Sequence, residues 1–115
     1  MARVFISGSS TGLGLMAGQL LIEEGHEVVF HARNRERARH TLDALLLGHD
    51  IVVGDLSTIA GARNVAEQVN KLGRFDAVIH NAGVGNHEMQ IRTEDGLPHV
   101  FAINTLAPYV LTALI

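Results

Sequence analysis

A glycine-rich loop near the N-terminus holds the first residues whose types and spacing could do chemistry. Residues 7–14 read Ser-Gly-Ser-Ser-Thr-Gly-Leu-Gly and follow the short apolar run Val4 to Ile6. Glycines at a strand-to-helix turn let the backbone bend sharply and approach a ligand, and the free N–H groups of the following helix attract phosphate. The loop therefore predicts a dinucleotide site. The residues expected to contact the nucleotide are Gly8, Ser10, Thr11, Gly12, Leu13 and Gly14.

The position that selects the nucleotide comes at the end of the second apolar run, about 20 residues past the glycines. Sites for NAD(H) place a carboxylate there, which accepts a hydrogen bond from the ribose 2′-hydroxyl. This sequence has Arg33 and Asn34 instead. A guanidinium pairs with a 2′-phosphate, whereas a carboxylate would repel it. We therefore expect NADP(H) to be preferred over NAD(H), and we expect Arg35, Arg37 and Arg39 to lie on a solvated helix face.

A second interpretation of the same loop is a serine hydrolase. Gly8 to Gly12 also fits the pattern G-x-S-x-G, in which Ser10 would be the nucleophile. A nucleophile elbow follows an earlier strand whose loop supplies oxyanion donors, but only seven residues precede this motif. Gly14 also has no role in a hydrolase, so this function remains a remote alternative.

The elements that must position these residues alternate regularly along the chain. Short apolar runs predict strands at 4–6, 28–30, 51–53 and 75–80. Helices are predicted from Leu13 to Gly25, from Asn34 to Gly48, from Ser57 or Thr58 to Gly73, and from Pro98 onward. Strands without alternation indicate a sheet covered on both faces. Right-handed crossovers then predict an α/β fold, a doubly wound parallel sheet of the Rossmann type with strand order 3-2-1-4.

Apolar residues at helical spacing predict which face of each helix packs on the sheet. In the first helix they are Leu13, Met16, Ala17, Leu20 and Leu21, with Gly18 allowing close packing. In the second they are Ala38, Leu42, Leu45 and Leu46. In the third they are Ile59, Ala62, Val65, Ala66, Val69 and Leu72.

Composition excludes several classes of function. With 47% hydrophobic residues and 12 glycines in 115 residues, the chain can form one globular domain. The absence of Cys excludes disulfides and thiolate metal sites, and the seven His are scattered, so no metal site is expected. A net charge of −3 does not favour nucleic acid. The sequence shows no membrane span and no leader before its first apolar run, so a cytoplasmic protein is expected.

The last six residues, 110–115, are almost all apolar and have no helix-ending signal. A natural terminus is usually polar and frayed. We therefore expect residues 1–115 to form a single dinucleotide-binding domain that is incomplete, truncated before a fifth strand.

Four blocks in order resemble the short-chain dehydrogenase/reductase family. The first is the glycine loop, which is similar to the family's T-G-x-x-x-G-x-G with Ser7 in place of Thr. The others are Asp55-Leu56, which borders the adenine in the family, His80-Asn81-Ala82-Gly83, which resembles N-N-A-G, and Phe101-Ala102-Ile103-Asn104 with Leu111-Thr112. Together with Asp95-Gly96-Leu97, the last block resembles the branch of retinol-dehydrogenase-like reductases.

The resemblance implies further nucleotide contacts at Asp55, Leu56, Asn81, Ala82 and Gly83. All five follow predicted strands, at the edge of the sheet where ligands bind. The Asp55 carboxylate could accept from the adenine amine, and helix capping is its alternative role. Small residues after the fourth strand would admit a ribose.

Asn104 is the catalytic residue that the resemblance implies, because the family uses the backbone at this Asn to hold a water in its proton relay. Pro108, four residues later, has no N–H to donate to the Asn104 carbonyl. We therefore expect a kink in this helix and a carbonyl that is free to bind water. A packing kink without a role in catalysis is the alternative.

His80 is expected to pack at its strand end rather than to bind a metal.

The family's remaining catalytic residues, a Ser and a Tyr-x-x-x-Lys pair, have no counterpart here. The one Tyr, Tyr109, and the one Lys, Lys71, lack that spacing. The resemblance therefore implies the N-terminal, cofactor-binding part of an NADP(H)-dependent oxidoreductase that acts on a small carbonyl or alcohol substrate. This part alone is expected to be inactive, and the full-length protein is expected to be a homo-oligomer. A nucleotide-binding module without chemistry, such as a redox sensor, is the alternative.

Overall fold

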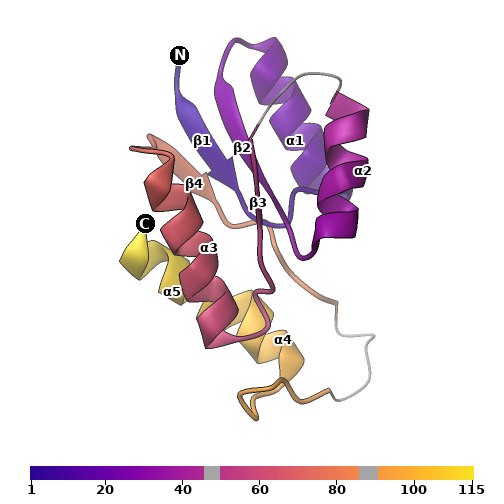
Figure 1. Cartoon of the computed structure of the whole chain (residues 1–115), viewed down its shortest axis with the longest axis vertical. Coiled ribbons are helices and arrows are strands. Elements are labelled where there is room, and N and C mark those ends of the chain that lie inside the picture. The colour runs from indigo at the N-terminus through magenta and orange to yellow at the C-terminus, as the bar shows by residue number, and fades with distance from the viewer. Residues whose placement is uncertain (46–49, 86–90) are drawn as a thin grey trace.

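Short apolar strands assemble into a parallel sheet in the computed structural model, which describes residues 1–45, 50–85 and 91–115 (Figure 1). The strands are β1 (Arg3–Ile6), β2 (Glu27–Ala32), β3 (Ile51–Val53) and β4 (Ala77–Ile79). They pair in parallel in the order β3-β2-β1-β4, which confirms the predicted α/β topology. No helix within these residues is long and apolar enough to cross a membrane.

Helices cover both faces of the sheet, with α1 and α2 on one side and α3 and α5 on the other (Figure 1). Their bounds are α1 Gly12–Glu23, α2 Arg35–Leu45, α3 Ile59–Lys71, α4 His99–Phe101 and α5 Ala107–Leu114, with a π-helical segment at Ala102–Leu106 between the last two. Neighbouring β1 residues point to opposite sides: Phe5 packs in the α3 and α5 cluster, whereas Val4 packs in the α1 cluster. The predicted Leu46 and the helix end at Gly48 lie outside the described residues, as do the side chains of Leu42 and Leu45.

The predicted buried face of α1 is wrong in part. Three of its five residues are largely exposed, namely Leu13, Met16 and Leu20. The fully buried positions are Gly14 and Gly18, because α1 approaches the sheet through its glycines. A Cβ on Gly18 would overlap the ring of Phe30 in β2. Close backbone packing therefore turns the helix away from the orientation that its apolar residues predict.

β4 departs from the expectation that every strand is covered on both faces. Val78 packs against the cluster on the α3 side, but Ala77 and Ile79 are exposed. β4 pairs with β1 on one side, and no further described strand pairs with its other edge. Ile79 is 39% exposed.

The N-terminus of α3 is capped twice. Thr58 is the N-cap, and its Oγ1 accepts from the Gly61 N–H at 3.0 Å, as one of the two predicted caps should. The Asp95 carboxylate, 36 residues later, accepts from the Ile59 N–H at 2.7 Å. The buried face of α3 consists of the predicted Ala62, Val65, Ala66 and Val69, whereas Ile59 is exposed.

Asp95→Ala is expected to lower the free energy of unfolding by about 1 kcal/mol, because it removes a capping acceptor and a negative charge from the positive end of the α3 dipole. Urea denaturation followed by circular dichroism measures the change. Glu94→Ala is the matched control, since Glu94 is also exposed and on the same turn. Equal effects of the two variants would contradict the capping role of Asp95.

Candidate functional site

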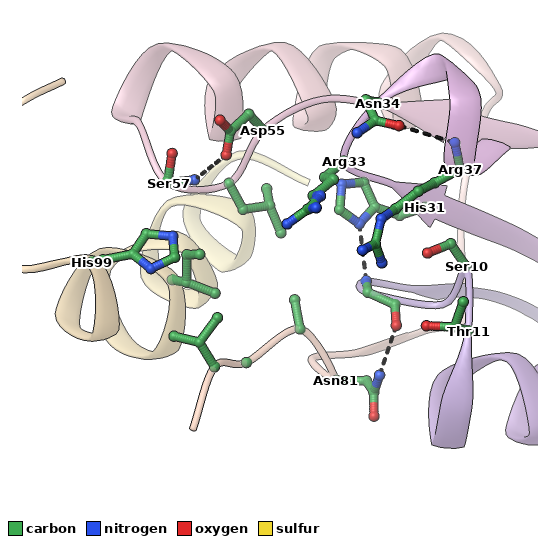
Figure 2. A pocket seen from close by; sticks show the side chains of 16 residues that line it. Ser10, Thr11, His31, Arg33, Asn34, Arg37, Asp55, Ser57, Asn81 and His99 are labelled. Carbon is green, nitrogen blue, oxygen red and sulfur yellow. Dashed lines mark hydrogen bonds between the residues drawn. The ribbon is translucent and has the colours of Figure 1, made fainter. Parts of the chain in front are cut away.

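A pocket of about 510 Å³ opens at the carboxyl ends of the strands (Figure 2). It lies where the chain continues from β1 to one side of the sheet and from β4 to the other, since β2 and β4 flank β1. Ligands of doubly wound sheets bind at such a point. Ten of the predicted nucleotide contacts line it: Gly8, Ser10, Thr11, Arg33, Asn34, Asp55, Leu56, Asn81, Ala82 and Gly83. Six further lining residues had not been predicted to bind: His31, Arg37, Ser57, Val84, His99 and Ile103. Gly12, Leu13, Gly14 and Asn104 are not among the lining residues, and nucleotide binding at all these positions stays a prediction.

The backbone of Gly8 is held by hydrogen bonds at both its N–H and its carbonyl. Its N–H donates to His31 Nδ1 at 2.9 Å, and its carbonyl accepts from Asn81 Nδ2 at 3.0 Å (Figure 2). Gly8 has φ +63°, and a Cβ there would lie 2.6 Å from the Cα of Ala82. This position needs glycine for two reasons, the left-handed backbone and the close approach of the segment after β4.

Gly14 does not line the pocket but packs directly against the glycine loop. A Cβ on this residue would lie 2.5 Å from Asn81 Nδ2 and 2.7 Å from the Gly8 carbonyl oxygen. α1 can therefore begin directly beneath the loop only because Gly14 has no side chain.

Two buried hydroxyls hold the loop to its neighbours. Ser7 Oγ accepts from the N–H groups of Asn81 and Ala82 at 3.2 and 3.1 Å. Ser9 Oγ donates to the Ile6 carbonyl at 2.7 Å and accepts from the His31 N–H at 2.8 Å. The loop is therefore attached to the ends of both β2 and β4 before any ligand binds.

One side of the pocket is cationic. Arg33, just after β2, and Arg37, in α2, both line it. Arg37 is exposed, as expected for a solvated helix face, and it borders the pocket as well. The Asn34 side chain accepts from the Arg37 N–H at 2.9 Å and so starts α2 beside the pocket (Figure 2). Neither guanidinium forms an ion pair with any carboxylate in the described ranges. Thr41, also in α2, donates to the Ser10 carbonyl at 2.9 Å.

Asp55 lies at the other end of the pocket, after β3. Its carboxylate accepts from the Ser57 N–H at 2.9 Å, in the turn that precedes α3 (Figure 2). Since Thr58 is the N-cap, the alternative role of Asp55 as the helix cap is wrong. The carboxylate is exposed, so it keeps acceptor capacity toward the pocket.

Asn104 lies in the π-helical segment, where the Ala107 N–H donates to the Ala102 carbonyl five residues back. The helix is therefore irregular just before Pro108, with a π turn, whereas the kink predicted from Pro108 stays a prediction. The Asn104 side chain accepts from the Val84 N–H at 2.8 Å and donates to the Val84 carbonyl at 3.0 Å. Asn104 thus holds the segment after β4 beside the pocket, and a water on its own carbonyl stays a prediction.

His80 is exposed at the end of β4, and its Nε2 lies 2.9 Å from Thr112 Oγ1 in α5. This contact agrees with a packing role at the strand end. In the parts of the chain that the structure describes, no three metal-binding side chains come together.

The fold changes the pKa of His31. Burial lowers the pKa of its imidazole, while a hydrogen bond to the Gly54 carbonyl and the charge of Asp55 act in the opposite direction. The side chain is only 3% exposed. Both ring nitrogens are engaged by backbone groups, Nδ1 by Gly8 and Nε2 by Gly54, so this imidazole is not available as a base for Ser10.

Comparison with known proteins agrees with this architecture. The family described as short chain dehydrogenase matches residues 2–115. An uncharacterized oxidoreductase of Emericella nidulans is 51% identical over 99% of this chain and 46% of its own length. The short-chain dehydrogenase chyC of Penicillium rubens is 39% identical over 100% of this chain and 44% of its own length.

A solved structure shows the same fold. The active-site complex of Pseudomonas aeruginosa RhlG with NADP has a TM-score of 0.81 and 28% identity over 98% of this chain and 46% of that one. The chain thus spans about half the length of the relatives that it matches. The glycine loop, the strand order and the family match together show that this chain belongs to the short-chain dehydrogenase/reductase family of oxidoreductases.

Proposed function

We propose that this chain is the NADP(H)-binding domain of an oxidoreductase that transfers hydride between the nicotinamide and a small carbonyl or alcohol substrate. The observation that carries the NADP(H) preference is the presence of Arg33 and Arg37 in the pocket, where an NAD(H) site would have a carboxylate. The likeness to RhlG, whose structure is an NADP complex, supports this choice.

The pocket residues fit the parts of such a nucleotide. Ser10 and Thr11 offer hydroxyl donors beside the two guanidinium groups, at the end of the pocket where a 2′-phosphate would be held. Asp55 offers an acceptor for the adenine amine, and Ala82 and Gly83 leave space for a ribose. The bound nicotinamide would supply or accept the hydride.

We expect proton transfer to and from the substrate to need residues of the full-length protein that this chain does not contain. By resemblance, a Ser and a Tyr-x-x-x-Lys pair would transfer the proton, and the Asn104 backbone would hold a water in that relay. Asn104 contributes by holding Val84 in place through its two side-chain hydrogen bonds. A homo-oligomeric, cytoplasmic enzyme is the further expectation for the full-length protein.

Replacing Arg33 by alanine is expected to weaken NADPH binding about 10- to 100-fold and to leave NADH binding nearly unchanged, because a charge-assisted hydrogen bond contributes about 1.5–3 kcal/mol. Fluorescence titration of each dinucleotide measures both affinities. Arg39→Ala is the control, since Arg39 is exposed in α2 but is not among the pocket residues.

The affinities of the Arg33→Ala variant for NADPH and NADH, compared with those of the wild type, test the proposal. Equal losses of NADPH and NADH affinity would show that Arg33 does not recognise the 2′-phosphate. Labelling of Ser10 by an acylating probe, together with no dinucleotide binding, would support the hydrolase instead.

A further inference from the structure

We propose that His31 is a positioning residue for the phosphate-binding loop: its neutral imidazole ties the Gly8 peptide to the backbone after β3, and the loop leaves its binding form when this link breaks. The importance of the link for binding rests on the proposed function, whereas the link itself can be measured without any nucleotide. Nothing in the glycine pattern of the loop requires a histidine in β2.

The imidazole connects three segments, namely the glycine loop, β2 and the backbone after β3. Nδ1 accepts from the Gly8 N–H at 2.9 Å, and Nε2 lies 2.8 Å from the Gly54 carbonyl oxygen. The main chain of the same residue is bonded to Ser9, since the His31 N–H donates to Ser9 Oγ and the His31 carbonyl accepts from the Ser9 N–H. His31 therefore holds the loop through its side chain and its backbone at once.

The two partners select one tautomer. The Gly8 N–H is a donor, so Nδ1 must carry a lone pair. The Gly54 carbonyl is an acceptor, so Nε2 must carry the proton. A protonated imidazole would direct an N–H from Nδ1 at the Gly8 N–H, and the hydrogen bond would become a donor–donor contact. The link therefore exists only while His31 is neutral.

Gly8 is where such a link matters most. The Gly8 carbonyl, in the next peptide unit, accepts from Asn81, and the φ of +63° places the loop against Ala82. Without the imidazole, the Gly8 N–H would lose its hydrogen-bond partner in a part-buried position, which is unfavourable. A rotation of this peptide would satisfy the N–H, but it would also move Ser10 and Thr11 at the mouth of the pocket.

The charged groups around the imidazole come from three segments that line the same pocket. Asp55 follows β3 and favours the protonated form. Burial opposes it and is the largest effect. Arg33, just after β2, and Arg37, in α2, are the cationic side chains that line the same pocket. The glycine loop contributes no charged side chain. The result is a pKa below the ordinary value of 6.5, so His31 stays neutral at neutral pH and the link persists. This link, from the Gly8 N–H through the imidazole to the Gly54 carbonyl, is called the clamp below.

Three variants distinguish the effect of the His31 hydrogen bonds from the effect of its side-chain packing. His31→Asn keeps an acceptor near the position of Nδ1 but cannot be protonated, and His31→Phe keeps the ring but removes both hydrogen bonds. His26→Asn is the matched control: His26 Nδ1 also accepts a backbone N–H, from Ala2 at 2.9 Å, but it lies at the other end of the sheet. Circular dichroism establishes that each variant folds.

The binding measurement is calorimetric titration with NADP⁺ between about pH 8 and pH 5.5, a range that spans the titration of histidine. His31→Phe is expected to weaken binding about tenfold or more at both ends of the range, and His31→Asn by less than about threefold at the upper end. The 2′-phosphate also gains a proton near pH 6, and all variants share that effect. The clamp predicts a steeper loss of affinity toward acid in the wild type and in His26→Asn than in His31→Asn.

Nitrogen-15 NMR of the imidazole and of the Gly8 amide tests, without any nucleotide, whether the link exists. The expected result is the Nε2–H tautomer at neutral pH and loss of Gly8 amide protection as His31 is protonated. The Nδ1–H tautomer, or parallel pH profiles of the wild type and His31→Asn, would overturn the proposal. If NADP⁺ bound to none of the proteins while the NMR result held, the proposed function would fail and the clamp would stand as a feature of the loop.

Discussion

Gly8→Ala is expected to lower the free energy of unfolding by about 2–5 kcal/mol and to abolish measurable NADPH binding. Two costs add at this position. A non-glycine residue at φ +63° costs about 1–2 kcal/mol. The new methyl group would lie 2.6 Å from the Cα of Ala82, and overpacking against backbone costs about 1–3 kcal/mol more. Urea denaturation followed by circular dichroism measures the stability, and fluorescence titration measures the binding.

Gly12→Ala is the control that separates the two costs. Gly12 has nearly the same backbone angle, φ +60°, but a Cβ there would meet nothing within 4 Å. This variant should therefore lose only about 1–2 kcal/mol. If the two alanine variants lost the same stability, the close approach of the segment after β4 to the glycine loop would be wrong.

The topology could be predicted from the sequence because each element has its own local signal. Apolar runs such as Ile51–Val53 coincide with β3, and the glycines at positions 25 and 73 follow α1 and α3 in left-handed conformations. Right-handed crossovers then leave few sheet orders to consider. The place of the pocket was also predictable, because parallel strands bring their carboxyl ends together.

The orientation of α1 could not be predicted from hydrophobic periodicity, because the side chains that would normally set it are absent. Gly14 and Gly18 let the helix axis approach Phe30 and Asn81 more closely than any apolar side chain would allow. Periodicity counts apolar side chains, so it gives no weight to a helix that packs through its backbone.

His31 and Arg37 were missed for different reasons. A lone His within an apolar strand resembles a core residue, and its partners here are backbone atoms of Gly8 and Gly54, which have no sequence signature. Arg37 had a usable signal. Asn34 is a favoured N-cap residue, and a cap there places position 37 three residues into the turn, beside the cap and the pocket.

The second large effect is expected from Gly61→Ala in α3, and two arguments disagree about its sign. Alanine in the interior of a helix is normally more stable than glycine by up to about 1 kcal/mol. In this helix, a Cβ on Gly61 would overlap the carbonyl oxygen of Asp55 and approach Thr58 Oγ1 to 2.9 Å. Overlap with backbone cannot be relieved by turning a side chain, so we expect a net loss of about 3 kcal/mol or more.

The neighbouring position provides the matched control for Gly61→Ala. Ala60 is exposed in the same turn of α3, so Ala60→Gly should lose only about 0.5–1 kcal/mol, the ordinary difference between the two residues in a helix. Urea denaturation of both variants compares these losses directly. A more stable Gly61→Ala protein would show that helix propensity outweighs the contact, and that the segment containing Asp55 does not pack on α3 in this way. A large loss, with weaker nucleotide binding in the fraction that still folds, would show that Gly61 matters because its missing side chain lets Asp55 reach the pocket.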